Sequence, residues 1–266
     1  MIAQDYTRVK DYLNKTKLKS LDYVINPYVG CPHKCLYCYA SYMSSFSKHT
    51  ESWGDFIDVK CTNKKINIFK IKGKKVQIST VTDPYNNFEK EFGVTRKVLE
   101  QLIKSEALIS IVTKSDLVLR DIDLFKQIKH IDVGVSISML DEDLKVKLEP
   151  NSSSIAQRIE TLKVLKSEGI KTVCYISPII PGITVFEKIV EATKDYVDEY
   201  CFDKLDLRSS FKTKMFNFIK QEHKDLIPLY DAIYNKKTSD YFEKTADEIA
   251  NYCNKNNLKY NIKYHN

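Results

Sequence analysis

The chain has 266 residues, of which 43% are hydrophobic, so it is long enough to bury a sizeable core. No apolar run approaches the ~20 residues that a membrane-spanning helix needs, so we expect a protein without a membrane partner. Lys and Arg outnumber Asp and Glu by 42 to 35, a net charge of +7. Because the Lys residues are scattered, this excess favours an anionic partner only weakly.

The run NPYVGCPHKCLYCYA contains Cys31, Cys35 and Cys38 in the spacing C-x3-C-x2-C. Three thiolates so close in sequence can bind three irons of a four-iron cluster and leave the fourth iron open to a small ligand. Ordinary electron-carrier clusters use a fourth protein Cys. The loop therefore predicts a cluster that takes part in chemistry.

Two other interpretations of the loop remain open at this point. His33 or His49 could complete a zinc site, although the spacing is unlike the paired C-x2-C motifs of structural zinc. A disulfide framework is disfavoured, because seven Cys is an odd number and we see no secretory leader; we expect reduced thiols and a cytoplasmic location. The remaining cysteines stand in apolar settings and predict buried structural thiols: Cys61, Cys174, Cys201 and Cys253.

After the loop, short β-prone runs alternate with amphipathic helical patterns. Expected strands cover residues 24–29, 76–81, 108–113, 133–138, 172–177 and 200–207, and the clearest helices cover 95–104 and 155–166. Apolar strands separated by helices predict an α/β fold with a parallel sheet, about six βα units that close into a full or partial barrel. We expect this core in residues 1–210. Residues 211–266 predict a helical extension packed on the core, with a possible last strand at 260–264.

Polar residues recur where the expected strands end. They are Thr82, Asp83, Lys114, Ser136, Ser138 and Ser177. In a barrel of parallel strands these positions share one edge with the cysteine loop, where a ligand could lie across the mouth. Each serine could equally be a simple strand terminator.

The loop and its neighbours resemble the radical S-adenosylmethionine (SAM) enzymes, and within them the spore photoproduct lyase-like branch. The resemblance rests on NPYVGCPHKCLYCYA, WGDFIDVK, STVTDPY, TKSDLVLRDIDL, SISMLDEDLKVKLEPNSSSIAQRIETLKVLKSEGI and ISPIIPGIT, which cover most of residues 23–184. It implies a partial TIM-type (β/α)6 barrel, a [4Fe-4S] cluster, SAM, and an electron donor such as flavodoxin or ferredoxin. In that superfamily SAM chelates the open iron, and reductive cleavage yields a 5'-deoxyadenosyl radical.

Carried onto this sequence, the resemblance makes Cys31, Cys35 and Cys38 the cluster ligands. Together with the edge positions, it places cofactor contacts at Tyr37, Thr82, Asp83, Lys114, Ser136, Ser138 and Ser177. A Lys ammonium suits the methionine carboxylate, and short hydroxyls can serve the ribose without crowding.

Two positions are candidates for the hydrogen transfer itself. The lyase family places a hydrogen-donating Cys just before its Ser-Asp pair, whereas this chain has Thr80 there. A hydroxyl bond is too strong to give up a hydrogen atom as a thiol does, so we expect a substrate other than a DNA photoproduct. By analogy, Tyr39 is a candidate hydrogen relay.

Relatives of the lyase include queuine lyases, which act on a deazaguanine base and release its aminomethyl precursor, preQ1. The resemblance therefore implies a lyase acting on a small modified purine-like base or nucleoside, with queuine salvage as the best specific hypothesis. Such a base needs an acid for its N–H edge and aromatic rings for stacking. The candidates for substrate contacts are Tyr85, Glu89, Tyr175, Asp206 and Arg208. By contrast, Glu149 and Arg158 are expected to form an internal structural pair.

Two further hypotheses stay open. One keeps the radical chemistry but directs it at DNA, tRNA or peptide, which would call for a concentrated basic face or an extra binding domain. The other is a metal-stabilised nucleic-acid-binding protein in which the three cysteines are structural. The TDPY, TKS and ISPIIPG blocks favour an enzyme.

Overall fold

The core of the protein is one eight-stranded sheet, seen in a computed structural model that describes residues 2–207 and 209–264. The strand order is β11-β10-β9-β8-β7-β6-β3-β2. All neighbouring strands run parallel except β2, which pairs antiparallel with β3. The strands are β2 (Leu13–Lys15), β3 (Tyr23–Ile25), β6 (Lys75–Ile78), β7 (Leu108–Thr113), β8 (Ile131–Ser136), β9 (Lys171–Ile179), β10 (Glu199–Lys204) and β11 (Tyr260–Ile262).

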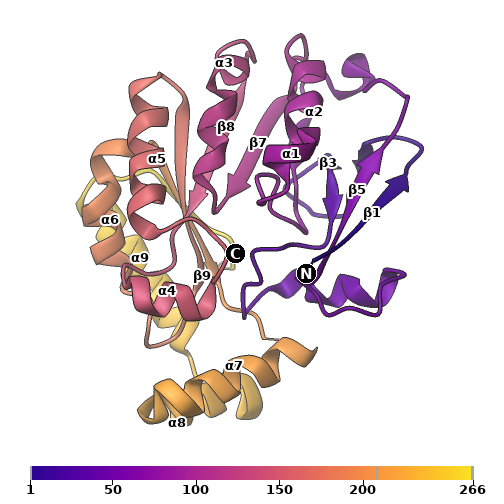
Figure 1. Cartoon of the computed structure of the whole chain (residues 1–266). Coiled ribbons are helices and arrows are strands. Elements are labelled where there is room, and N and C mark those ends of the chain that lie inside the picture. Colours follow the sequence, from indigo (N-terminus) through magenta and orange to yellow (C-terminus); the bar gives the residue numbers. More distant parts are fainter. Residues whose placement is uncertain (1, 208, 265–266) are drawn as a thin grey trace.

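Helices lie between successive strands and cover the outer side of the sheet (Figure 1). They are α1 (Glu89–Phe92), α2 (Val94–Leu102), α3 (Ile122–Phe125), α4 (Glu142–Leu148), α5 (Ile155–Ser167) and α6 (Phe186–Thr193), with short 3-10 turns η2 (Ile68–Ile71), η3 (Asp116–Asp121) and η4 (Lys194–Tyr196). Helix α2 buries Val98, Leu99 and Leu102, and α5 begins at a capping box made by Ser154 and Gln157. The predicted partial (β/α)6 barrel is confirmed.

The two sides of the sheet differ because side chains alternate along each strand. On β9, Thr172 faces the helices and donates to the Tyr196 carbonyl at 2.7 Å. Tyr175 faces the opposite side, where a Cβ on Gly134 would lie 2.5 Å from its ring. The same register brings polar residues to this inner side: Gln77, Ser110, Asp132, Ser136, Lys171, Ser177, Glu199 and Asp203. The inside of the barrel is therefore polar.

The first predicted strand, residues 24–29, is wrong as a single element. Strand β3 ends at Ile25, and β4 (Tyr28–Val29) belongs to a second, three-stranded sheet with β5 (Phe56–Cys61) and β1 (Ala3–Arg8) in the order β1-β5-β4. Pro27 lies between β3 and β4 and has no N–H to continue the ladder. After this break the chain leaves the main sheet and continues through β4 into the cysteine loop.

Residues beyond 208 do more than add helices. They form α7 (Ser209–Glu222), η5 (Lys224–Leu226), α8 (Ile227–Asp231), the short π-helix η6 (Ala232–Lys236), α9 (Tyr241–Lys255) and finally β11. The predicted last strand is confirmed, and it pairs with β10, so this part of the chain shares the main sheet. Helix α7 contacts the 3-10 helix η1 (Tyr39–Phe46) that follows the cysteine loop, and Figure 1 shows α7 and α8 beyond the lower end of the sheet. None of the helices described is both long and apolar enough to cross a bilayer.

Candidate functional site

The three cysteines of the loop lie together at the edge where the strands end. Burial, together with the nearby Cys38 and Asp83, raises the pKa of the Cys31 thiol to about 12. Burial also raises the pKa of Cys35, and Cys38 and Cys31 act in the same direction. All three thiols are free of disulfides. The structure therefore brings together the three residues that the spacing predicts as ligands.

The thiols do not converge on a single ion. Within residues 2–207 and 209–264, no group of three His, Cys, Asp or Glu side chains is arranged to hold one metal ion. A four-iron cluster does not need such a group, because each Cys binds a different iron. The zinc alternative needs it, and His49 is already engaged by Asp58 at 2.6 Å and Glu51 at 3.3 Å. His49 is therefore not free to complete a zinc site, and the three cysteines suit a cluster in which each sulfur binds its own iron.

Two glycines let a second segment pack directly against the loop. Gly30 has φ +85°, and a Cβ there would lie 2.3 Å from the carbonyl oxygen of Phe56. Gly54 has φ +101°, and a Cβ there would lie 2.6 Å from the Lys34 side chain. Both positions need glycine for conformation and for space. The WGDF segment is thus fixed on the cysteine loop.

Asp83 organises the edge beside the loop. Its carboxylate accepts hydrogen bonds from the Thr113 hydroxyl at 2.6 Å and the Lys114 N–H at 2.7 Å, and it lies 3.3 Å from Nδ1 of His33. Burial alone would raise the pKa of this carboxyl, but His33 and the hydrogen bonds outweigh burial and lower it to about 2. Asp83 therefore positions His33 and Lys114, while a direct contact with SAM stays a prediction.

Thr82 holds the loop through one hydrogen bond, from its hydroxyl to the Gly30 carbonyl at 2.6 Å. We expect Thr82→Val to lower the free energy of unfolding by about 1 kcal/mol, the usual value of such a bond. Denaturant titration would measure this, with Thr238→Val, at an exposed position, as the control. The Kd for SAM should stay unchanged in the reconstituted variant; a much weaker Kd would mean that Thr82 touches the cofactor instead.

Buried polar atoms without partners gather at this edge. Eight buried side-chain nitrogen or oxygen atoms in the described chain lack a hydrogen-bond partner, and five of them belong to residues around the loop and the strand ends: His33, Ser41, Trp53, Ser79 and Ser138. Buried polar groups are nearly always paired in a complete protein. Their concentration here fits a site that takes a polar cofactor and a cluster.

Other predicted residues also meet at the edge. The Tyr39 hydroxyl donates to the Thr80 carbonyl, so the structure brings the two candidates for hydrogen transfer together. The Ser136 hydroxyl donates to the Ser177 carbonyl at 3.0 Å. The Lys114 ammonium lies 5.8 Å from the centre of the Tyr37 ring, beside the loop.

The structure contradicts the prediction that Glu89 and Tyr85 contact a substrate. Both side chains are 0% exposed. Glu89 accepts from Arg120 at 2.7 Å and from the Tyr28 hydroxyl, while the Tyr85 hydroxyl donates to Asp121 at 3.0 Å. The turn after β6 carries them into a buried charge network instead of toward the barrel mouth. Both residues are structural.

The remaining predicted substrate contacts have mixed outcomes. Tyr175 lies on the inner side of the barrel, as a stacking residue would. Asp206 is exposed, and Arg208 lies outside the described residues. The predicted pair of Glu149 and Arg158 is confirmed as a buried ion pair.

Asp203 and Lys263 are inner residues that the sequence did not single out. Burial raises the pKa of the Asp203 carboxyl, and Lys263 partly offsets this. Burial also raises the pKa of Tyr39, and the charges of Cys38, Tyr42 and Asp203 add to that increase. The Lys263 ammonium lies 5.0 Å from the centre of the Tyr175 ring. The sequence pattern along β10 could have identified Asp203, because alternate residues of a strand face opposite sides of the sheet: the run is Tyr200, Cys201, Phe202 and Asp203.

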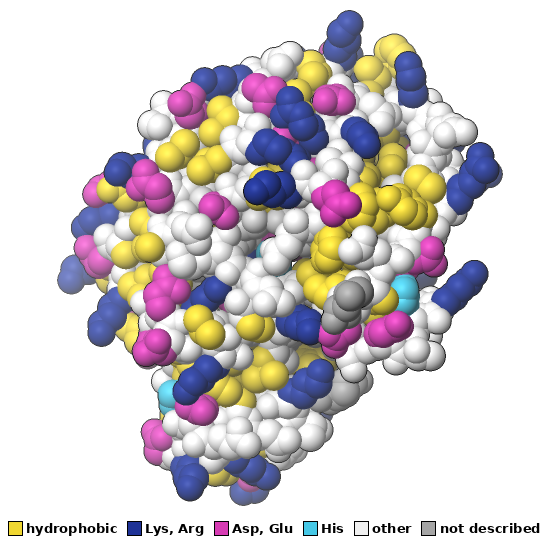
Figure 2. Space-filling view, viewed as in Figure 1, with side chains coloured by type: hydrophobic (Ala, Val, Ile, Leu, Met, Phe, Trp, Pro, Cys, Tyr) yellow, Lys and Arg dark blue, Asp and Glu magenta, His cyan; other side chains and the backbone are white. Residues whose placement is uncertain are grey.

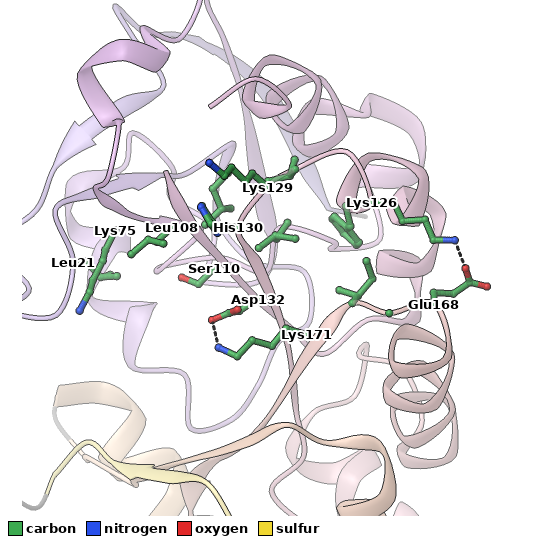
Figure 3. Close-up of a pocket in the computed structure, with 16 residues that line it drawn as sticks. Leu21, Lys75, Leu108, Ser110, Lys126, Lys129, His130, Asp132, Glu168 and Lys171 are labelled. Atoms are coloured by element: carbon green, nitrogen blue, oxygen red, sulfur yellow. Dashed lines mark hydrogen bonds and ion pairs between the residues drawn. The ribbon is translucent and has the colours of Figure 1, made fainter. Parts of the chain in front are cut away.

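A cavity of about 720 Å³ opens at the opposite end of the sheet, where strands β6 to β9 begin. Figure 3 shows Lys171 directed at Asp132 and Lys126 at Glu168, and these are ion pairs of the structure. None of the three loop cysteines lines this cavity. It is separate from the candidate site.

Positive charge is dispersed on the face that Figure 2 shows, where Lys and Arg alternate with Asp and Glu. Many of the lysines are paired with carboxylates, for example Lys147 with Glu222 and Lys194 with Glu191. This face has no concentrated basic patch for a nucleic acid.

The family model described as "Radical SAM superfamily" matches residues 25–195. The chain belongs to the radical SAM superfamily. An uncharacterized protein of Methanocaldococcus jannaschii, MJ0683, is 38% identical over 257 residues, which cover 94% of this chain and 93% of that protein. The uncharacterized protein ORF301 of Acidianus two-tailed virus is 29% identical over 64% of this chain and 60% of its own length.

Solved structures agree with the fold. A spore photoproduct lyase complexed with dinucleoside spore photoproduct has a TM-score of 0.61 at 13% identity, covering 87% of this chain and 79% of its own. SuiB of Streptococcus suis bound to S-adenosylmethionine has a TM-score of 0.59 at 12% identity, covering 98% of this chain and 51% of its own. Both are similar in fold to this chain.

Radical SAM enzymes use a [4Fe-4S] cluster and SAM, and the residues present fit both. Cys31, Cys35 and Cys38 would hold three irons. Nε2 of His33 and the Ser138 hydroxyl are buried without a partner, and the Lys114 ammonium lies beside the loop, so these polar groups would be available to SAM. Because the chain belongs to the radical SAM superfamily, we reject the hypothesis of a nucleic-acid-binding protein in which the three cysteines hold a structural metal.

Proposed function

We propose that this radical SAM enzyme abstracts a hydrogen atom from a small modified nucleobase or nucleoside and fragments it as a lyase, with queuine as the first substrate to test. When bound, the cluster and SAM supply the 5'-deoxyadenosyl radical. The protein's own residues bind and orient the substrate. A small acidic electron carrier such as flavodoxin or ferredoxin is the proposed reductant.

One observation carries the substrate class: a partly buried carboxylate, a cation and an aromatic ring occur together on the inner side of the barrel. Asp203 sits on the inner side of β10 with its pKa raised by burial. The Asp203 carboxylate accepts a hydrogen bond from the Lys204 N–H at 2.9 Å. A carboxylate can accept several hydrogen bonds, so it can also accept one from a substrate. Tyr175 offers a ring for stacking, with Lys263 over it. A purine-like base presents a flat face and an N–H edge, which this set can bind.

The chain also lacks the thiol that would restore hydrogen to a DNA photoproduct. Residues 79–81 are Ser79, Thr80 and Val81, and the Thr80 carbonyl accepts from Tyr39. An enzyme without a donor at this position is better suited to a substrate radical that breaks apart. This supports fragmentation over repair.

The test uses reconstituted protein with SAM and dithionite under anaerobic conditions. We expect queuine to stimulate release of 5'-deoxyadenosine and to yield preQ1, both measured by mass spectrometry. Parallel reactions contain a queuosine nucleoside, dinucleoside spore photoproduct and a peptide. Stimulation by the photoproduct or the peptide alone would overturn the small-base proposal.

Asp203→Asn tests the recognition that we assign to the carboxylate. Because a hydrogen bond to a charged group contributes about 1.5–3 kcal/mol, we expect the KM for the base to rise at least about tenfold. Cleavage of SAM without substrate should persist. Asp195→Asn, at an exposed position in η4, is the control and should leave the KM unchanged. An unchanged KM in Asp203→Asn would exclude this residue from the substrate site.

A further inference from the structure

The cavity at the beginning of strands β6 to β9 has a wall that the strand register builds. Ser110 of β7 pairs with Asp132 of β8, and Asp132 pairs with Lys171 of β9. Leu108 and His130 lie two residues before Ser110 and Asp132, so they face the same inner side of the sheet. All five residues line the cavity, and Figure 3 shows their side chains close to one another. The volume of about 720 Å³ falls within the range of about 300–1,000 Å³ that is typical of small-molecule sites.

The cavity carries positive charge that the protein does not neutralise. Both of its carboxylates are already paired, Asp132 with Lys171 at 2.8 Å and Glu168 with Lys126. Three further basic side chains of the lining form no ion pair within residues 2–207 and 209–264: Lys75, Lys129 and His130. A concave surface with an excess of one charge attracts ions of the opposite charge. The cavity therefore favours an anion.

The hydrogen-bonding groups of the wall suit a phosphate. The Ser110 hydroxyl is half-buried and makes no hydrogen bond in the part of the chain that the structure describes. It can donate to a ligand, as can the ammonium groups of Lys75 and Lys129. A phosphate monoester carries about −1.5 to −2 charges at pH 7 and presents three strong acceptor oxygens, whereas a carboxylate carries one charge and two oxygens. Lys binds phosphate as a point charge.

Leu108 adds an apolar surface to the same wall. Its side chain is 45% exposed, although it belongs to a strand inside the sheet. On one side its register partner on β6 is Lys75, and on the other the His130 carbonyl accepts from the N–H of the adjacent Ile109 at 3.0 Å. Two of the unpaired basic residues therefore flank an exposed apolar side chain. An anion with an organic part can use both features.

We propose that this cavity is a second binding site whose ligand is a phosphate ester of nucleotide size. The unpaired basic residues and the Ser110 hydroxyl bind the phosphate, and the organic part lies on Leu108. None of the cysteine-loop residues lines the cavity, so the inference does not depend on the proposed function. A free nucleotide and the phosphorylated end of a nucleic acid present the same chemistry, and the test separates these two sources.

The test measures binding by equilibrium dialysis on the reconstituted enzyme saturated with SAM, which keeps nucleotides out of the cofactor site. The probes are cytidine 5'-monophosphate, cytidine, and a hexanucleotide with and without a 5'-phosphate. We expect a phosphorylated probe to bind at least about tenfold more tightly than its unphosphorylated form, because charged hydrogen-bond partners are lost without the phosphate. Binding of the monophosphate identifies a free nucleotide as the ligand, and phosphate-dependent binding of the hexanucleotide alone identifies a nucleic-acid end.

Two variants locate the binding in this cavity. Ser110→Ala and the double variant Lys75→Ala/Lys129→Ala should each raise the Kd of the phosphorylated probe at least about tenfold. The control is Lys90→Ala/Lys163→Ala, which removes the same charge from exposed positions outside the cavity and should leave the Kd unchanged. The Kd for SAM should stay the same in all of them. The proposal is overturned if neither phosphorylated probe binds, if the phosphate makes no difference, or if the two double variants weaken binding equally.

Discussion

Replacing Cys31, Cys35 or Cys38 singly with alanine is expected to abolish both the cluster and the cleavage of SAM. Three sulfurs hold three irons, and no other Cys in the chain stands near enough in sequence to substitute. Iron content, visible absorbance and 5'-deoxyadenosine release should all fall to background. Each measurement is made on anaerobically reconstituted protein.

Cys61→Ala provides the matched control for these variants. Cys61 was predicted to be buried, but this is wrong: it is exposed at the end of β5, outside the loop, whereas Cys174, Cys201 and Cys253 are buried as predicted. It should retain wild-type iron content and SAM cleavage. If a loop variant kept a full four-iron cluster and wild-type cleavage while Cys61→Ala lost them, the assignment of ligands would be wrong.

Arg158→Leu is expected to lower the free energy of unfolding by about 3–5 kcal/mol, the cost of leaving a buried charge without its partner. The Arg158 guanidinium is 1% exposed, pairs with Glu149, and donates to the carbonyls of Ser136 and Ser153 at 3.0 Å each. Glu149 also accepts from the Tyr37 hydroxyl. Because Tyr37 belongs to the cysteine loop, we expect the loss of the Arg158–Glu149 pair to destabilise this loop as well.

Chemical denaturation of the metal-free protein would measure this effect. Lys163→Ala on the same helix α5 is the control, because its pair with Glu160 is exposed and such pairs contribute about 0–1 kcal/mol. A change below about 1 kcal/mol in Arg158→Leu would show that Glu149 is not held as a buried charge. The double variant Arg158→Leu/Glu149→Leu should recover part of the lost stability.

The sequence allowed prediction of the barrel because its signals are local. Strand β7 is a continuous apolar run and was predicted with its exact bounds, Leu108–Thr113. The cysteine spacing is likewise contained in eight residues. The small sheet was not predicted, since β5 pairs with β1 and β4 across distant parts of the chain. Pairing of that kind leaves no periodic pattern in either segment.

Prediction of substrate contacts failed for a different reason. Glu89 follows a strand at the expected edge, but the next turn brings it beneath Arg120, and a sequence pattern does not show the direction of a turn. Asp203 was missed because β10 was treated as a buried run. Its alternate residues in fact face opposite sides, with Phe202 buried at 0% and Asp203 partly exposed.

The parallel pairing of β1 with β5, from Ala3 beside Phe56 to Arg8 beside Cys61, has a practical consequence for anyone expressing this enzyme. An affinity tag or a truncation that disturbs the first eight residues would free one edge of the strand that leads directly from Trp53 and Phe56. Oxygen sensitivity and poor iron loading in such a preparation could then originate far from the cysteines. Purification handles belong after the last strand or behind a long spacer.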